Sequence, residues 1–158
     1  MWPIVEAKNH HSKGAYHVLN RTILEVCAPD YNNDAKIIEE WLSNKTVQNV
    51  TSWIESTKLF SVVCIGNNGN VVGFGLTTLD GEILLNYVLP EFLFQGIGKK
   101  MLALMEKKII STGIHEIIVV SSITAKPFYE RNGYVKNGEP IRVGNIQGDF
   151  PLIKQVFT

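Results

Sequence analysis

The chain has 158 residues, and its 15 basic and 15 acidic side chains give a formal net charge of zero. A hydrophobic fraction of 45% with 19% charged residues is enough to build a buried core and excludes a disordered chain. Balanced charge gives no general attraction to nucleic acid or to an anionic membrane, so we expect neither as a partner. We expect one domain over residues 1–158.

The amino-terminal part of the chain carries the signals of a short strand followed by helices. Met1–Ala7 has a short apolar beginning that is compatible with an edge strand. Ala15–Val26 places its apolar side chains at helical spacing. A second helix follows Asn33 or Asp34, either of which can cap its first turn. A third short helix is expected over Val47–Ser56.

From Leu59 the pattern changes to that of strands. Two β-rich segments flank the turn sequence at residues 66–70, and Asp80-Gly81 makes a second turn. A third strand follows over Glu82–Leu89 and is ended by Pro90. These signals predict a three-stranded antiparallel meander.

The remaining third of the chain alternates between helix and strand. Gly96–Thr112 predicts the longest helix, with Gly113 as its stop. The β-branched run at Glu116–Ser121 predicts a central strand that is covered on both faces. A short helix and a final hairpin are expected over residues 125–131, 134–143 and 150–157.

Several classes of protein are not expected from these patterns. The longest apolar stretches, such as Leu59–Ile65, have the length of a strand and not of a membrane span. Met1–Asn9 lacks the features of a secretory signal, so a cytoplasmic location is expected. Cys27 and Cys64 have no CxxC spacing and the histidines have no metal spacing, so we expect reduced thiols and no metal.

A pair of glycines opens the longest predicted helix directly after a strand. Gly96 and Gly98 leave backbone N–H groups unpaired at the positive end of the helix dipole, which is a place that binds phosphate. Without Cβ atoms, the two glycines allow a pyrophosphate to approach. Gln95, Lys99 and Lys100 can add donors or charge.

Two common phosphate loops do not fit this segment. A P-loop needs a glycine at Leu93, and a dinucleotide loop needs a further glycine at Met101. The segment Val88–Lys100 instead follows the pattern V-x-P and then [RQ]-x-x-G-x-[GA], and Ala125–Tyr134 follows A-x-x-F-Y-E-x-x-G-[FY]. With both blocks in order and a strand between them, nearly the whole chain resembles the GNAT superfamily of N-acetyltransferases. Leu93 departs from the usual Arg or Gln, which weakens one side-chain contact.

This resemblance implies a fold and a cofactor. The fold is an α/β fold with a mixed, mostly antiparallel central sheet of about seven strands flanked by helices. Its fourth and fifth strands are splayed by a bulge near the end of the fourth. Acetyl-CoA is implied as co-substrate in the opening, with its pantetheine arm along the backbone of Tyr87 and Val88 and a further contact to Ser122. The implied diphosphate site consists of Gln95, Gly96, Ile97, Gly98, Lys99 and Lys100.

The resemblance also implies catalytic roles. Tyr129 is the implied general acid for the departing thiolate, although it can equally be an ordinary core tyrosine whose hydroxyl reaches water. A backbone N–H near Val88 is the implied oxyanion donor. Glu82 has two interpretations, as the base that deprotonates the amine or as a charged residue after a turn. Cys27 and Cys64 lie outside both blocks, which argues for direct attack without a covalent intermediate.

The acceptor is implied to bind at the loop between the first two helices, which offers Asp30 and Tyr31. An acidic or aromatic pocket there suits a cationic amine, although Asp30 can also serve only to stabilise the turn. The expected function is transfer of the acetyl group of acetyl-CoA to a primary amine of a small molecule or peptide. Two alternatives remain, a non-catalytic acyl-CoA-binding module and a transferase for a longer acyl group. A homodimer through the carboxy-terminal hairpin is a further hypothesis.

Overall fold

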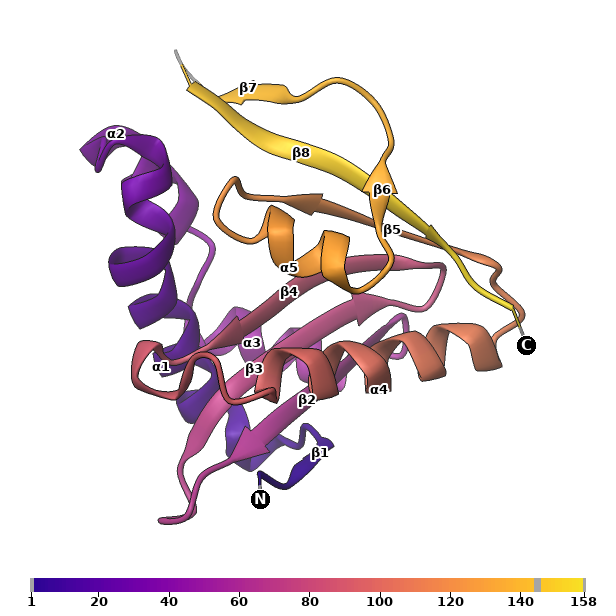
Figure 1. The fold of residues 1–158 in the computed structure, drawn as a ribbon. Helices are drawn as coiled ribbons and strands as arrows, with labels where there is room; N and C mark the ends of the chain where they lie inside the picture. Colours follow the sequence, from indigo (N-terminus) through magenta and orange to yellow (C-terminus); the bar gives the residue numbers. More distant parts are fainter. Residues whose placement is uncertain (1, 144–145, 158) are drawn as a thin grey trace.

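A computed structural model describes residues 2–143 and 146–157, without the side chains of residues 142–148. Its sheet runs in the order β1-β2-β3-β4-β5-β8-β6, and β7 pairs with β8 (Figure 1). The predicted sheet of about seven strands is therefore confirmed. The strands are β1 (Ile4–Glu6), β2 (Leu59–Ile65), β3 (Val71–Thr78), β4 (Glu82–Val88), β5 (Glu116–Ser121), β6 (Val135–Lys136), β7 (Ile141–Val143) and β8 (Ile146–Gln155).

Five α-helices flank this sheet in the described part of the chain: α1 (Ser12–Thr22), α2 (Ala35–Leu42), α3 (Val47–Glu55), α4 (Ile97–Ser111) and α5 (Lys126–Arg131). The first helix differs from its predicted bounds of 15–26, because it begins earlier and changes into a π-helical turn at Ile23–Cys27. No helix in these ranges is both long and apolar enough to cross a membrane.

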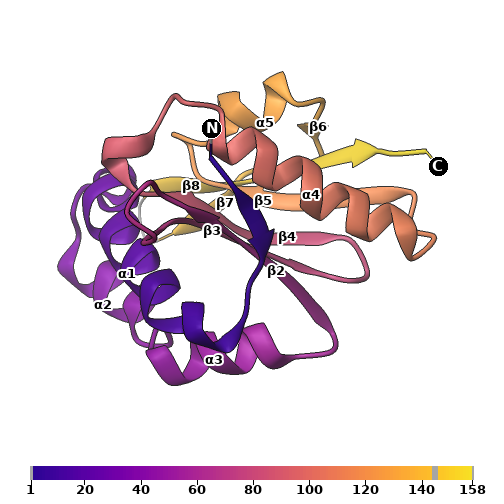
Figure 2. The ribbon, with the colours of Figure 1, turned by 90° about the horizontal axis from the view of Figure 1, so that it is seen from below.

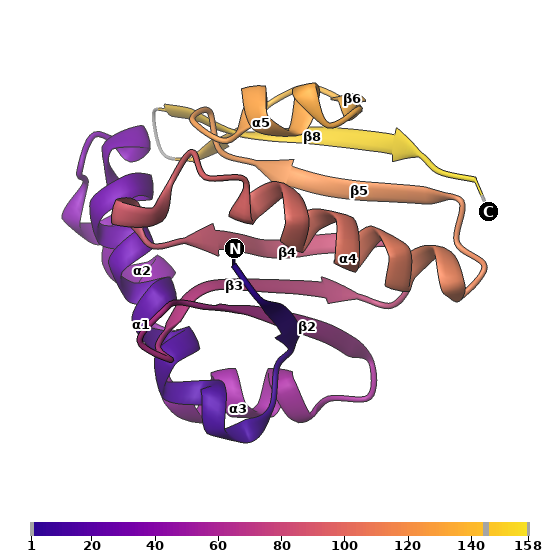
Figure 3. The same cartoon turned by 60° about the horizontal axis from the view of Figure 1, so that its bottom comes forward.

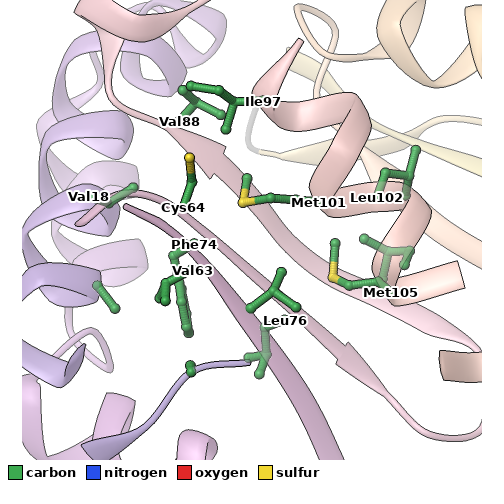
Figure 4. Packing of buried hydrophobic residues seen from close by; sticks show 14 of the residues in the cluster. Val18, Val63, Cys64, Phe74, Leu76, Val88, Ile97, Met101, Leu102 and Met105 are labelled. Atoms are coloured by element: carbon green, nitrogen blue, oxygen red, sulfur yellow. The ribbon is translucent and has the colours of Figure 1, made fainter. Parts of the chain in front are cut away.

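The helices form a layer on each face of the sheet. α4 and α5 lie on one face, and α1 and α3 lie on the other (Figure 2). Two glycines of β3 let α4 approach closely, since a Cβ at Gly75 would come within 2.9 Å of the terminal methyl of Met105. On the opposite face of β3, Phe74 is fully buried, as is Val18 of α1 (Figure 4). The core therefore continues through both faces.

Local signals set most of the element ends. The Asp34 carboxylate accepts hydrogen bonds from the backbone N–H groups of Lys36 at 3.0 Å and Ile37 at 3.1 Å, so Asp34 caps α2. Thr46 caps α3 by accepting from the backbone N–H of Asn49 at 3.0 Å. Gly113 follows α4 with a φ of +88°, as its position at the predicted stop requires.

β4 and β5 form the one parallel pair among the described strands, and they separate early. They pair only at Glu82 with Ile118 and at Ile83 with Val119. The two strands then move apart along their length (Figure 3). The predicted splay of the fourth and fifth strands is therefore confirmed.

The bulge in β4 lies near the start of the strand and not near its end, so the predicted position was wrong. Leu85 pairs with Leu76 of β3, whereas Ile83 pairs with the next residue, Thr77. Leu84 is the extra residue. A bulge bends the strand and increases its twist, which accounts for the divergence of β4 from β5 directly after Ile83.

β5 lies in the interior of the sheet, but only one of its faces is covered. Ile117, Val119 and Ser121 are buried, whereas Ile118 and Val120 are 37% and 46% exposed. The prediction of a strand covered on both faces was therefore wrong. A run of β-branched residues favours a strand, but it does not indicate whether one or both faces of that strand are covered by other elements.

Candidate functional site

The amino-terminal end of α4 leaves open space in front of its free N–H groups. Gly96 precedes the helix with a φ of +83°, a conformation that L side chains rarely adopt. A Cβ at Gly98 would meet only the Phe128 ring at 3.6 Å and Asn86 at 3.8 Å, which are ordinary contacts. Packing within the chain therefore does not require a glycine at position 98. The open space suits an anion, such as a pyrophosphate, that approaches the helix end.

The predicted side chains around this helix end differ in exposure. Gln95, Lys99 and Lys100 are exposed and can reach a bound anion, whereas Ile97 is buried and anchors the helix to the core. Leu93 packs against the core cluster instead of pointing outward. Its apolar character is thus explained by packing.

The backbone of β4 presents hydrogen-bonding groups toward the opening. The Leu89 N–H donates to the Val72 carbonyl oxygen at 2.9 Å, so these two residues form a hydrogen-bonded pair across β3 and β4. Bonded and non-bonded pairs alternate along an antiparallel ladder. Val88 and Asn86 therefore turn their N–H and C=O groups toward β5, while the backbone of Tyr87 faces β3. An extended arm could pair with Val88 and Asn86, and Asn86 was missed from the sequence.

Tyr129 lies next to this opening on α5. Its side chain is 6% exposed, and its ring packs edge-on against those of Phe128 at 5.1 Å and Tyr134 at 5.5 Å between centroids. Burial raises the pKa of Tyr129 above its usual range, and the nearby Asn86 side chain offsets part of that rise. The hydroxyl therefore keeps its proton at neutral pH, as a proton donor must.

Asn86 connects Tyr129 to the start of α4. Its Nδ2 donates to the Gly98 carbonyl oxygen at 3.1 Å. Its Oδ1 is buried without a hydrogen-bond partner among the described residues. A buried acceptor of this kind is uncommon and is consistent with a donor supplied by a ligand.

Three other predicted site residues lie around the opening in different ways. The Ser122 hydroxyl accepts a hydrogen bond from the Ala125 N–H at 3.2 Å and holds the turn before α5. The Asp30 carboxylate accepts from the Thr124 hydroxyl and from the Thr124 N–H, so it ties the loop before α2 to the turn before α5, 94 residues away in the sequence. Glu82 lies in the paired part of β4 and β5, ahead of the bulge.

A cavity of about 480 Å³ lies between α2 and the diverging strands. Its aromatic and aliphatic walls are Tyr31, Ile37, Trp41, Leu84, Leu85, Tyr87 and Val120. The bulge brings Leu84 to this cavity, where its side chain is 41% exposed. Tyr31 thus lines a cavity beside β4, as an acceptor-binding residue would, whereas Asp30 does not line it.

Three charged side chains complete the walls: Glu40, Lys45 and Asp149. The Tyr31 hydroxyl donates to the Asp149 carboxylate at 2.7 Å, across 118 residues of sequence. Burial and this carboxylate raise the pKa of Tyr31. Sequence reasoning missed all three charged residues, because none of them belongs to a local motif.

The two cysteines are free, buried thiols, as predicted. Burial raises the pKa of Cys27 to about 12 and also raises the pKa of Cys64. Neither thiol is therefore a thiolate nucleophile at neutral pH. Over the described ranges, no three His, Cys, Asp or Glu side chains are grouped to hold a metal ion.

Comparisons with known proteins agree with this geometry. Residues 27–148, which are more than half of the chain, match the Acetyltransferase (GNAT) domain family. No curated protein matches the sequence.

Solved structures share the fold at low sequence identity. A GCN5-related N-acetyltransferase from Rhodopseudomonas palustris has a TM-score of 0.83 at 18% identity, over 99% of this chain and 96% of that one. The PaiA N-acetyltransferase from Thermoplasma acidophilum, in complex with coenzyme A, has a TM-score of 0.80 at 18% identity, over 98% and 99%. The yncA protein from Salmonella typhimurium, with its cofactor acetyl-CoA, has a TM-score of 0.77 at 15% identity, over 100% and 95%.

Proposed function

The chain belongs to the GNAT acetyltransferase family, and from that premise we propose that it transfers the acetyl group of acetyl-CoA to a primary amine. The observation that carries this proposal is the meeting of three features beside the split strands. These are the open helix end at Gly98, the free backbone edge of β4 and the protonated hydroxyl of Tyr129. Two structures of similar fold contain coenzyme A or acetyl-CoA, which supports the choice of co-substrate.

The residues present fit such a co-substrate. The first-turn N–H groups of α4 would hold the pyrophosphate, with Lys99 and Lys100 close enough in sequence to add charge. The outward N–H and C=O groups of Asn86 and the outward C=O group of Val88 would pair with the amides of the pantetheine arm, which leaves the Val88 N–H free for the thioester. Ser122 stands on the opposite side of the opening, directly after β5.

The chemistry follows from the groups at the opening. A neutral amine attacks the thioester carbonyl, so a C–N bond forms and the C–S bond breaks. The Val88 N–H would stabilise the oxyanion, and Tyr129 would give its proton to the departing thiolate. Counted from its ammonium form, the acceptor loses two protons: one before the attack, which makes the amine neutral, and one after it, which restores Tyr129. Asp149 lines the acceptor cavity and can accept the other, whereas Glu82 lies ahead of the bulge and would have to act through water.

Direct attack is preferred over a covalent intermediate. Cys27 lies close enough to Tyr87, a residue of the cavity wall, for that residue to influence its pKa. Burial holds the pKa of its thiol at about 12, so almost none of it is ionised at neutral pH. An acyl-cysteine step would start from a very poor nucleophile.

The test is calorimetric titration with acetyl-CoA of the wild-type protein and Gly98→Glu. A Cβ at Gly98 meets only ordinary contacts, and the carboxylate that it carries in this variant would oppose a pyrophosphate at the start of α4. We expect micromolar binding by the wild type and a loss of about 10- to 100-fold in the variant. Leu104→Glu makes the same charge change at an exposed position of α4 and should bind normally. A folded wild-type protein that does not bind acetyl-CoA would remove the proposal.

A further inference from the structure

Lys45 is a half-buried cation without a partner. It lies in the turn between α2 and α3, where its backbone N–H donates to the Leu42 carbonyl oxygen at 2.9 Å. Its side chain lines the cavity beside β4. Among the side chains that the structure describes, which exclude those of residues 142–148, no carboxylate lies within ion-pair distance of its ammonium group, and that group makes no hydrogen bond.

Other partly buried lysines of the chain are paired. Lys154 contacts Glu106 at 3.2 Å and Lys126 contacts Glu130 at 3.3 Å. For Lys45, burial lowers the pKa, and no nearby charge opposes that change. Its ammonium group is not enclosed by the protein, so this unpaired charge is available to a ligand that carries negative charge.

Lys45 shares the cavity wall with residues that lie beside the reaction centre. Tyr87 lies close enough to Tyr129 and Tyr31 for both to raise its pKa, and Tyr31 bonds Asp149. These groups form one cluster at the β4 end of the cavity. Lys45 lines the same cavity as the carboxylates of Asp149 and Glu40 but forms an ion pair with neither of them.

Apolar side chains make up much of the cavity wall. Trp41 packs edge-on against Tyr31 at 5.1 Å between ring centroids and lines the cavity from α2. Leu84 and Val120 face it from the sheet and are 41% and 46% exposed. A ligand that spans the cavity would bury this apolar surface along its length.

Resting on the proposed function, we propose that the acceptor is an amine that also carries an anionic group, with an apolar body between the two. Lys45 binds the anion, and Trp41, Leu84 and Val120 pack against the body. The amine lies at the Asp149 end, beside Tyr87 and the edge of β4. The class is that of amino acids and related amino acid-like molecules, in place of the purely cationic amine expected from the sequence.

Matched acceptors that differ only in the anionic group test this inference. The pairs are leucine with isoamylamine, phenylalanine with phenethylamine, aminohexanoate with hexylamine, and phosphoethanolamine with ethanolamine. Thiol release from acetyl-CoA gives kcat/KM for each acceptor with the wild type, Lys45→Met, Lys45→Arg and Lys36→Met. Lys36 is an exposed lysine of α2 that does not line the cavity, so it is the matched control.

We expect the wild type to prefer the anionic member of at least one pair by about 10- to 100-fold in kcat/KM, the range for one charge-assisted contact. Lys45→Met should abolish that preference, Lys45→Arg should retain most of it, and Lys36→Met should leave it intact. If the preference depends on Lys45 only in the phosphoethanolamine pair, the anionic group is a phosphate and not a carboxylate.

Two results would overturn the inference: preference for the uncharged members, or equal effects of Lys45→Met on both members of every pair. If no acid is a substrate, the same acids are titrated into protein saturated with coenzyme A. Binding that depends on Lys45 would sustain the inference, and its absence would end it. Intact acetyl-CoA binding in the same preparation would leave the proposed function standing, so the two failures are distinguishable.

Discussion

At the scale of single residues, the chemistry depends on groups whose burial sets their protonation. Tyr129 is buried and has a raised pKa, so its hydroxyl is a proton donor across the range in which amines become neutral. Cys27 is buried in the same region and keeps its thiol protonated. Burial therefore keeps the Tyr129 hydroxyl available as a proton donor, and it keeps the Cys27 thiol from acting as a competing nucleophile.

Tyr129→Phe should lower kcat by about 100-fold, the usual contribution of a positioned general acid. Acetyl-CoA affinity should change little, because phenylalanine fills nearly the same volume. Since the pKa of Tyr129 is raised, its ionisation should cause no fall in wild-type kcat below about pH 10.

Tyr134→Phe is the matched control for this change. The Tyr134 hydroxyl donates to Glu106 at 2.7 Å, so its loss should cost about 1 kcal/mol of stability and leave kcat near the wild-type value. Equal kcat in Tyr129→Phe and the wild type would contradict the role of Tyr129.

The residues that were predicted from the sequence belong to local patterns. Gly96 and Gly98 open a helix directly after a strand, and Tyr129 stands in a second block of contiguous residues. Lys45 and Asp149 have no such context. They line one cavity only because α2 and β8 are brought together by the folded sheet, which no spacing within either segment reports.

At the scale of elements, α2 is the helix on which the cavity wall depends. It supplies Ile37, Glu40 and Trp41 to the cavity, yet none of its residues is fully buried. Most helices in proteins are stabilised chiefly by packing of a buried face. α2 therefore depends more than its neighbours on its cap at Asp34.

Asp34→Ala should destabilise α2 by about 1 kcal/mol and speed exchange of its amide protons by about fivefold. KM for the acceptor should rise, because Trp41 and Glu40 lose their fixed positions, while acetyl-CoA affinity stays the same. Asp34→Ser keeps a capping oxygen and should restore both properties. Unchanged exchange rates in Asp34→Ala would show that α2 does not depend on this cap.

Elements with local signals were predicted, and those set by distant contacts were not. The turn at Gly69, the cap of α2 and the stop at Gly113 follow from residues within the same segment. The bulge at Leu84 depends on the pairing register with β3, and the exposed face of β5 depends on where α1 and α3 pack. Neither is encoded by the segment's own pattern.

At the scale of the whole molecule, three buried tyrosines join different layers of the fold. Tyr31 in the turn before α2 bonds Asp149 of β8 at 2.7 Å, and Tyr134 before β6 bonds Glu106 of α4 at 2.7 Å. Tyr129 lies between Tyr31 and Tyr134 in the sequence, and its ring packs against that of Tyr134. Burial raises the pKa of all three, so the folded state favours their neutral forms.

This arrangement predicts that the protein loses stability in alkali. The unfolded chain ionises its tyrosines near pH 10, whereas the folded chain holds these three protonated to higher pH. Their contribution is therefore complete below about pH 10 and is lost as pH rises above it, by about 1.4 kcal/mol per pH unit for each tyrosine. Urea unfolding measured between about pH 8 and 11 gives this slope.

Tyr129→Phe removes one of these buried hydroxyls without breaking an ion pair. Above about pH 10, the free energy of unfolding of this variant should therefore fall less steeply with pH than that of the wild type, by about 1.4 kcal/mol per pH unit. A free energy of unfolding that stays constant above pH 10, or equal slopes in the two proteins, would contradict the assignment of Tyr129 as a buried, protonated hydroxyl.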